Sequence, residues 1–350
     1  MTNYFENLNE TIKQYFEILS DEIPEFLYEY IDTPEMQKQK GISVSCGTIY
    51  SKMYNQMWYS SLDHSVAVAL IIWNFTKDKK QTLAGLFHDI STPVFKHTVD
   101  FMNGDYEKQE STEALTTKVI KNSKEIMYLL NRDGIKIEEV NDYHIYPVAD
   151  NDTPQLSSDR LEYTLTNGLG ATEKIWGLDD IREVYKNIEV QKNEQGIDEL
   201  GFKDKEIAEK FVHTMSFLSC MYRRNKTAFS MQFIADIMKK MSENGLITVN
   251  DLYNLSEREV IEKIRNCDQY NISKCFKIWE DATEIKESNT KIDDKYCVNI
   301  NKQKIRYINP LVKLENDYIR VYDVSETARQ DIENALNFRA NKYAYLDFQF

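Results

Sequence analysis

Apolar residues recur at helical spacing through most of this chain. One face of an opening helix is formed by Phe5, Leu8, Ile12, Phe16 and Leu19, because positions three and four apart share a face at 3.6 residues per turn. The same spacing predicts further helices over residues 62–75, 80–87, 107–122, 158–167, 181–194, 204–223, 227–243, 257–266 and 273–288.

The pattern changes after residue 288. Residues 297–300, 304–308 and 318–322 alternate apolar and polar side chains, as strands with one buried face do. One more helix is predicted over residues 326–338 and a final strand over residues 343–348. We therefore predict a mainly α protein, with a helical body over residues 1–288 and a small α+β appendage over residues 289–350.

Composition and charge narrow the class of protein. Of the 350 residues, 42% are hydrophobic and 29% charged, and only 11 Gly and 6 Pro interrupt the chain, which is typical of a helical globular protein. The net charge of −14 provides no basic footprint for nucleic acid, so a nucleic-acid partner is not expected. An anionic substrate would need positive charge from a metal ion or from a few Arg and Lys residues.

The cysteines and the apolar runs favour a soluble protein of the cytoplasm. The five cysteines are scattered and form no CxxC pair, which suits a reducing compartment. Residues 1–10 lack the basic start and apolar stretch of a signal peptide. The longest apolar run, residues 66–73, is too short to cross a bilayer, so no membrane partner is expected.

Three of the five histidines fall within residues 62–100. His64 lies near the start of one predicted helix, and His88 and Asp89 lie at the end of the next, because Pro93 disfavours helix just before it. Two imidazoles and a carboxylate suit a divalent metal ion, with a further carboxylate as fourth ligand. A His-Asp pair at a helix end can equally be a local charge interaction, so the residues alone leave both interpretations open.

Four segments together resemble a known family. Residues 62–66 (LDHSV), 85–90 (GLFHDI), 93–97 (PVFKH) and 156–167 (LSSDRLEYTLTN) resemble, in order and spacing, the motifs of the HD-domain phosphohydrolase superfamily, and more narrowly its deoxynucleoside triphosphate triphosphohydrolases. The resemblance covers about residues 30–170, is fainter over residues 221–238, and extends to a C-terminal tail like that of many bacterial HD proteins.

The resemblance implies a metal centre in an HD-type helical body. Its ligands would be His64, His88, Asp89 and Asp159, holding one divalent ion that could be Mn, Mg, Fe, Ni or Zn. Such an ion polarises a phosphoryl oxygen and acidifies a bound water molecule.

The resemblance also implies catalytic residues near the metal. His97 and Asp100 stand three residues apart, so on a helix they can form a hydrogen bond that fixes the imidazole for general acid catalysis. Glu110 matches an acidic residue of the family, although the histidine that usually precedes it is Gln109 here. The plain alternative for His97 and Asp100 is a surface pair.

Substrate-binding residues are expected on the helix that follows Asp159. Asp159, Tyr163 and Asn167 share one stripe, which in the family faces the nucleotide, and the guanidinium of Arg160 suits phosphate oxygens. Core packing for Tyr163 and a solvated ion pair for Arg160 are the alternatives.

A further pair, Ser45 and Cys46, matches the family positions that read the 3′-hydroxyl and crowd the 2′ position of the sugar. Both side chains are smaller than the family's, so poor discrimination between ribo- and deoxyribonucleotides is expected. Two other departures remove residues that bind the triphosphate in the resembled family: Thr92 replaces a histidine and Ser61 replaces an arginine.

Three functions are therefore compatible with the sequence. The first is hydrolysis of (deoxy)nucleoside triphosphates to nucleoside and tripolyphosphate. The second is hydrolysis of another phosphate ester, such as a nucleoside monophosphate or an alarmone. The third is a nucleotide-binding sensor without activity, which the intact set of four ligands disfavours. Relatives are commonly oligomers, so a homo-oligomer is expected.

Overall fold

The computed structural model describes residues 4–104, 115–300, 303–315 and 317–350. Its helices account for most of these residues, which confirms the predicted mainly α class. The helices are α1 (Glu10–Leu19), α2 (Glu25–Ile31), α3 (Pro34–Lys38), α4 (Ser61–Thr76), α5 (Lys79–Phe87), α6 (His97–Met102), α7 (Thr116–Asn122), α8 (Lys124–Arg132), α9 (Ser158–Thr166), α10 (Leu178–Lys186), α11 (Lys205–Tyr222), α12 (Asn225–Glu243), α13 (Val249–Asn254), α14 (Glu257–Arg265), α15 (Ile272–Asp281), α16 (Val321–Val324) and α17 (Glu326–Asn337).

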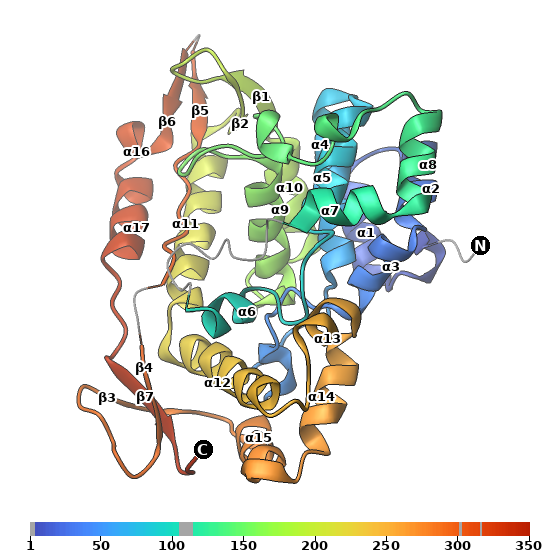
Figure 1. Cartoon of the computed structure of the whole chain (residues 1–350). Helices are drawn as coiled ribbons and strands as arrows, with labels where there is room; N and C mark the ends of the chain where they lie inside the picture. The colour runs from blue at the N-terminus through green and yellow to red at the C-terminus, as the bar shows by residue number, and fades with distance from the viewer. Residues whose placement is uncertain (1–3, 105–114, 301–302, 316) are drawn as a thin grey trace.

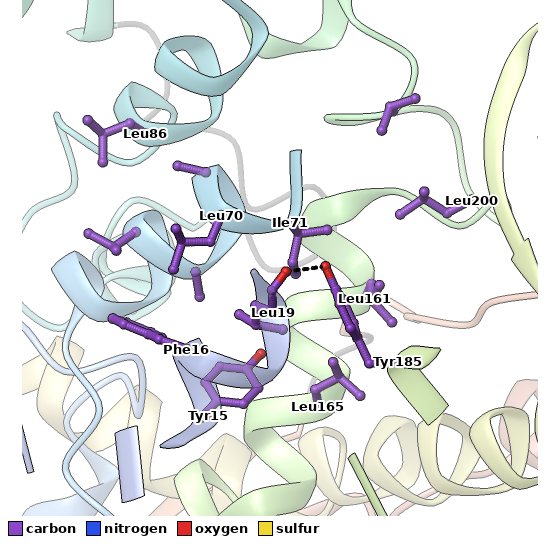
Figure 2. Close-up of a cluster of buried hydrophobic side chains, with 14 of the residues drawn as sticks. Tyr15, Phe16, Leu19, Leu70, Ile71, Leu86, Leu161, Leu165, Tyr185 and Leu200 are labelled. Carbon is purple, nitrogen blue, oxygen red and sulfur yellow. Dashed lines mark hydrogen bonds between the residues drawn. The ribbon is translucent and has the colours of Figure 1, made fainter. Parts of the chain in front are cut away.

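Helix α4 lies at the centre of the largest hydrophobic cluster of the described residues. Every residue from Ser61 to Ile72 is buried, as expected for a helix whose apolar residues cover almost all of its circumference. Helices α1, α5, α9 and α10 pack around it, and Figure 2 shows residues of this cluster, among them Leu19, Leu70 and Leu161. The hydroxyl of Tyr185 closes the cluster with a hydrogen bond of 2.7 Å to the carbonyl of Leu19.

A second hydrophobic cluster joins α12, α14 and α15 to the segment just before α6. Its members include Phe95, Phe233, Ile261 and Trp279, all essentially inaccessible to solvent. Figure 1 shows α12 and α15 in the lower half of the molecule, below the bundle formed around α4. The segment before α6 therefore lies between this lower cluster and the helices that carry the histidines.

Two small sheets complete the fold. Their strands are β1 (Ile188–Lys192), β2 (Asp198–Phe202), β3 (Lys286–Ser288), β4 (Tyr296–Asn299), β5 (Leu311–Leu314), β6 (Asp317–Arg320) and β7 (Tyr343–Leu346). One sheet has the order β1-β2-β5-β6, with β2 and β5 parallel and Gly201 opposite Leu311. The other is antiparallel, in the order β3-β7-β4.

The chain after residue 288 is tied to the helical body. Strand β5 pairs with β2, and α17 packs along α11 (Figure 1). Arg320, at the end of β6, donates to both carboxylate oxygens of Glu199 at 2.6 and 2.9 Å, and Glu199 is fully buried. Because a buried carboxylate needs a charged partner, this pair locks the C-terminal strands to β2.

Three predicted elements are wrong in whole or in part. The helix predicted over residues 273–288 ends at Asp281, and residues Lys286–Ser288 form β3, which pairs with β7. The helix predicted over residues 181–194 ends at Lys186, and residues Ile188–Lys192 form β1 instead, because Ile188 and Val190 are β-branched and pair with β2. The strand predicted over residues 304–308 is absent from the described part of that segment. There Ile308 enters the core and the N–H of Asn309 donates to the carbonyl of Pro154 at 2.8 Å.

Among the helices that the structure describes, none is both long and apolar enough to cross a bilayer.

Candidate metal centre

His64 is positioned by the first turn of α4. The hydroxyl of Ser60 accepts the N–H of Asp63 at 3.0 Å, and the carboxylate of Asp63 accepts the N–H of Ser60 at 2.9 Å. This reciprocal cap satisfies two N–H groups that a helix start leaves without partners. The hydroxyl of Tyr4 donates to the same carboxylate at 2.5 Å, so the start of the helix, from which His64 extends, is fixed.

His88 and Asp89 follow directly after the last residue of α5. The helix ends at Phe87, and the N–H of Ile90 then donates to the carbonyl of Phe87 at 3.0 Å in a tight turn. The helix end expected near Asp89 from Pro93 is thus confirmed to within two residues. Nδ1 of His88 lies 2.7 Å from the carbonyl of Gly85, one turn earlier, which aims the opposite edge of the ring away from its own helix.

Donor atoms of the predicted ligands lie near one another between α4, the end of α5 and α9. The Nε2 atoms of His64 and His88 are 3.2 Å apart, and they lie 3.9 and 3.7 Å from Oδ2 of Asp89. These three residues offer ligand atoms that all lie within 4.8 Å of one another. Oδ1 of Asp159, on α9, lies 3.2 Å from Nε2 of His64. The structure therefore groups three of the residues predicted as ligands, His64, His88 and Asp89, and places the fourth, Asp159, beside His64.

His64 and His88 both direct their Nε2 atoms toward the candidate metal position. Nδ1 of His64 faces the carboxylate of Glu162, and Nδ1 of His88 faces the carbonyl of Gly85. When these Nδ1 atoms carry the proton, both Nε2 atoms offer a lone pair to a metal ion. Two neutral imidazoles and two carboxylates then suit a divalent cation in donor type and in charge.

Glu162 is a part of this centre that the sequence analysis missed. It is fully buried, and it accepts hydrogen bonds from the hydroxyls of Tyr59 and Tyr15 at 2.7 and 3.4 Å. Burial alone would lower the pKa of His64, but the charge of Glu162 and the hydrogen bonds to Asp159 and Glu162 raise it to about 10. A metal ion at Nε2 would compete with that proton. The signal was a glutamate three residues after Asp159, on the same side of the helix.

Asp89 is surrounded by hydrogen-bond and charge partners. Its carboxylate accepts from the hydroxyls of Thr92 and Ser61 at 3.0 and 3.4 Å, and it forms an ion pair with Lys96. Burial opposes ionisation, yet Lys96 and then His88 hold the pKa of Asp89 well below its usual range. Thr92 and Ser61, which replace a histidine and an arginine of the resembled family, thus both contact the proposed ligand.

Lys96 was also missed by the sequence analysis, and it occupies an unusual turn. Phe95 and Lys96 have φ angles of +61° and +43°, in a region that bulky residues rarely adopt. Such conformations cost about 1–3 kcal/mol each and persist only where their surroundings enforce them.

His97 and Asp100 form the predicted pair on α6. Nδ1 of His97 lies 3.0 Å from Oδ2 of Asp100, whose side chain is fully buried. Burial lowers the pKa of His97, and the positive charges of Arg306 and Lys96 add to this effect, while Asp100 opposes it. Arg306 reaches this environment from the segment between β4 and β5, and the sequence analysis did not single it out.

The residues predicted along α9 have local partners. The guanidinium of Arg160 pairs with Asp150 at 3.0 Å and donates to Oδ1 of Asn151 at 2.6 Å. The amide of Asn167 donates to the carbonyl of Tyr163 at 2.6 Å. Tyr163 is half-buried, and burial raises its pKa to about 12. Phosphate binding by Arg160 and nucleotide binding by Tyr163 and Asn167 remain predictions.

The aromatic residue Tyr143 lies beside the predicted ligands and was not anticipated from the sequence. The ring of Tyr143 stacks on that of His88, with centroids 4.9 Å apart and planes 25° apart. Its hydroxyl lies 3.5 Å from Oδ2 of Asp159. Tyr143 therefore links a ligand of α9 to a ligand that follows α5, and no periodicity in the sequence pointed to it.

Ser45 and Cys46 lie on a turn next to α6. The hydroxyl of Ser45 accepts from that of Ser43 at 2.9 Å, and the carbonyl of Cys46 accepts from the hydroxyl of Thr98 at 2.8 Å. Burial raises the pKa of the Cys46 thiol to about 11. Their role beneath a sugar stays a prediction. Glu110 and Gln109 lie outside the described residues.

Comparisons with known proteins give two sequence relatives. The uncharacterized protein YdhJ of Bacillus subtilis is 24% identical over 333 residues, which span 91% of this chain and 94% of that protein. A metal-dependent phosphohydrolase, cns2 of Cordyceps militaris, is 24% identical over 148 residues, or 41% of this chain and 40% of that protein. The chain matches no protein-family model.

Solved structures with the same fold cover nearly the whole chain. A hypothetical protein from Aquifex aeolicus aligns with a TM-score of 0.63 and 17% identity over 93% of both chains. A phosphohydrolase from Bacteroides thetaiotaomicron aligns with a TM-score of 0.57 and 13% identity over 94% of this chain and 97% of that one. At these identities the likeness extends to the fold.

Proposed function

We propose that this chain is a metal-dependent phosphohydrolase of the HD type. The observation that carries the proposal is the grouping of His64, His88 and Asp89, with Asp159 beside His64: Nε2 of His64 lies 3.2–3.9 Å from donor atoms of two other segments, the residues after α5 and helix α9. The fold shared with a phosphohydrolase and the similarity to a metal-dependent phosphohydrolase support the same activity. A purely binding protein would not need a metal centre that activates water.

The proposed substrate is a (deoxy)nucleoside triphosphate, cleaved to nucleoside and tripolyphosphate. In that reaction a water oxygen forms a bond to the α-phosphorus, the bond from that phosphorus to the 5′-oxygen breaks, and the 5′-oxygen takes up a proton. The divalent ion, when bound, would acidify the water and offset the negative charge of the phosphate. Asp100 holds Nδ1 of His97, so Nε2 of His97 is the ring atom that would take up a proton, as from the attacking water, and pass it to the 5′-oxygen.

A second substrate class is favoured by Thr92 and Ser61. Both side chains contact Asp89, and neither can supply the positive charge that a triphosphate chain requires. A phosphate monoester, such as a nucleoside monophosphate, carries less charge and would need fewer cationic partners. In that case the water oxygen bonds to the single phosphorus, the bond from phosphorus to the ester oxygen breaks, that oxygen takes up a proton, and inorganic phosphate and the alcohol are released.

A substrate screen separates these possibilities. The purified chain would be incubated with Mn²⁺ or Mg²⁺ and with matched ribo- and deoxyribonucleoside triphosphates, monophosphates and an alarmone, and the products resolved by chromatography. We expect nucleoside and tripolyphosphate from the triphosphates, whereas inorganic phosphate from a monophosphate would support the second class. Failure to hydrolyse any phosphate ester with either metal would refute the proposed function.

The same screen tests the expected sugar selectivity. Because Ser45 and Cys46 are small, we expect kcat/KM for the deoxy form to exceed that for the ribo form by less than about a thousandfold. Even a close-fitting apolar side chain rejects an added hydroxyl by only about 10²-fold. A larger preference for the deoxy form would show that other residues contact the sugar.

A further inference from the structure

Lys96 brings a positive charge into the candidate metal centre. Its side chain is 11% exposed, and its ammonium pairs with Oδ2 of Asp89, the oxygen that also faces both Nε2 atoms. Of the Lys and Arg residues in the described segments, Lys96 is the one that forms an ion pair with a proposed metal ligand. Arg160, expected to contact phosphate, has its guanidinium committed to Asp150 and Asn151.

The turn that carries Lys96 is held from a distant part of the chain. Oε1 of Glu257, at the start of α14, accepts the backbone N–H of Phe95 at 3.2 Å and that of Ser43 at 3.0 Å. The N–H of Val94 donates to the carbonyl of Leu252 at 2.9 Å. Glu257 and the ring of Phe95 are fully buried. These contacts explain how two consecutive residues keep positive φ angles, and they fix where the Lys96 side chain starts.

A metal ion and the Lys96 ammonium cannot both be satisfied by Asp89 alone. A divalent cation held by His64, His88 and Asp89 would repel an ammonium that pairs with the same oxygen, because like charges a few ångströms apart repel more strongly in a largely buried site than in water. A buried ammonium also needs an anionic partner. A phosphate group on the metal is an anion within reach of a flexible four-carbon side chain.

We propose that Lys96 is a substrate-binding residue, which contacts the phosphate beside the metal, and that Glu257 is the positioning residue that holds it there. The proposal rests on the proposed function for the identity of the substrate, but its core is that a phosphate anion binds next to the metal through Lys96. Lys96 would supply one of the positive charges that Ser61 and Thr92 do not provide.

The direct test measures anion binding without turnover. Inorganic phosphate and tripolyphosphate would be titrated calorimetrically into the Mn²⁺-loaded chain, and Mn²⁺ alone into the metal-free chain. For Lys96→Met we expect the tighter of the two anions to bind at least about tenfold more weakly, as loss of a charged hydrogen bond implies, with Mn²⁺ binding as tight as in the wild type or tighter. Lys192→Met, an exposed lysine paired with Asp198 on the β1–β2 hairpin, is the matched control and should change neither affinity.

Glu257 is tested by a conservative and a disruptive variant. Glu257→Gln keeps a carbonyl oxygen that can accept both N–H groups, so anion affinity should stay near that of the wild type, whereas Glu257→Ala should weaken it. In a Lys96→Met background, Glu257→Ala should weaken anion binding no further. Additive losses would contradict the positioning role of Glu257. If Lys96→Met fails to fold, Lys96→Gln replaces it in the same titrations.

The outcomes separate the two proposals. Unchanged anion affinity in Lys96→Met, loss of Mn²⁺ binding in that variant, or no anion binding by the wild type would each overturn the role of Lys96. Hydrolysis by the wild type with unaltered kinetics in Lys96→Met would leave the proposed function standing without this inference. Lys96-dependent anion binding in a chain that hydrolyses no phosphate ester would leave the inference standing without the proposed function.

Discussion

Glu257 is a buried carboxyl group whose charge the surrounding protein disfavours. Burial raises its pKa to about 8, although the N–H groups of Ser43 and Phe95, the hydroxyl of Tyr50 and the charge of Lys96 all act in the opposite direction. Its second oxygen has no hydrogen-bond partner among the described residues. In the folded protein the group is therefore largely protonated at pH 7, while in the unfolded chain it ionises near pH 4.3.

This difference predicts a specific dependence of stability on pH. Because the folded pKa lies above the unfolded one, the stability contributed by Glu257 is complete below about pH 4 and is lost as pH rises to about 8. The loss is about 1.4 kcal/mol per pH unit within that window. Glu257→Gln removes the titration, so its unfolding free energy in urea should gain about 3–4 kcal/mol relative to the wild type between pH 5 and pH 8. Parallel pH profiles for the two proteins would contradict the buried, protonated state.

At the scale of single residues, the proposed ligands could be predicted from the sequence, but the residues that contact and orient them could not. His64, His88, Asp89 and Asp159 stand in motifs whose order and spacing could be compared with a family. Glu162, Lys96 and Tyr143 contact those ligands only through the fold, and a lone glutamate, lysine or tyrosine carries no pattern of its own. The pairing of His97 with Asp100 was predictable because both lie on one helical turn.

The packing of α4 against α5 sets the distance between His64, on α4, and His88, which follows α5. At Gly85 an added Cβ would come within 2.3 Å of Cδ1 of Ile72 and 3.3 Å of Cγ1 of Val68. Glycine therefore permits the close approach of these helices. The carbonyl of the same residue accepts from His88, so separating the helices would also move a proposed ligand.

A double-mutant cycle tests this contact. Gly85→Ala should lower the unfolding free energy by about 1–3 kcal/mol through overpacking, and Ile72→Val by about 0.5–1.5 kcal/mol through a lost methyl group. Ile72→Val removes the atom that the new Cβ would meet, so the double variant should be less destabilised than the sum of the two. Urea unfolding of all four proteins measures the coupling, and strict additivity would show that the helices do not meet as described.

At the scale of elements, helical periodicity predicted the body well and failed where strands pair over long distances. The burial of α4 and the start of α9 at Ser158 follow from local patterns that the sequence displays. Strands β1 and β2 depend on each other and on β5, more than 100 residues later. The β-branched Ile188 and Val190 favour a strand only weakly, and Ile188 also fits the apolar face begun by Ile181 and Val184, so residues 188–192 are compatible with a continuing helix until β2 pairs with them.

Across the whole molecule, the candidate centre joins parts of the chain that are far apart in sequence. Its four proposed ligands come from α4, the end of α5 and α9, all packed in the cluster around α4. Lys96 is held by α14, and Arg306 approaches from the C-terminal segment. The helical class was predictable from composition and periodicity. The involvement of segments beyond residue 250 was not, since it arises from packing alone.

The most direct test of the account is a crystal structure of the chain soaked with Mn²⁺, with anomalous diffraction data. We predict one anomalous peak whose centre lies about 2–2.5 Å from Nε2 of His64, Nε2 of His88 and carboxylate oxygens of Asp89 and Asp159, the usual range for such ligands. A peak at a different set of side chains, or no peak between α4, α5 and α9 at a saturating Mn²⁺ concentration, would contradict the metal centre and with it the proposed hydrolase.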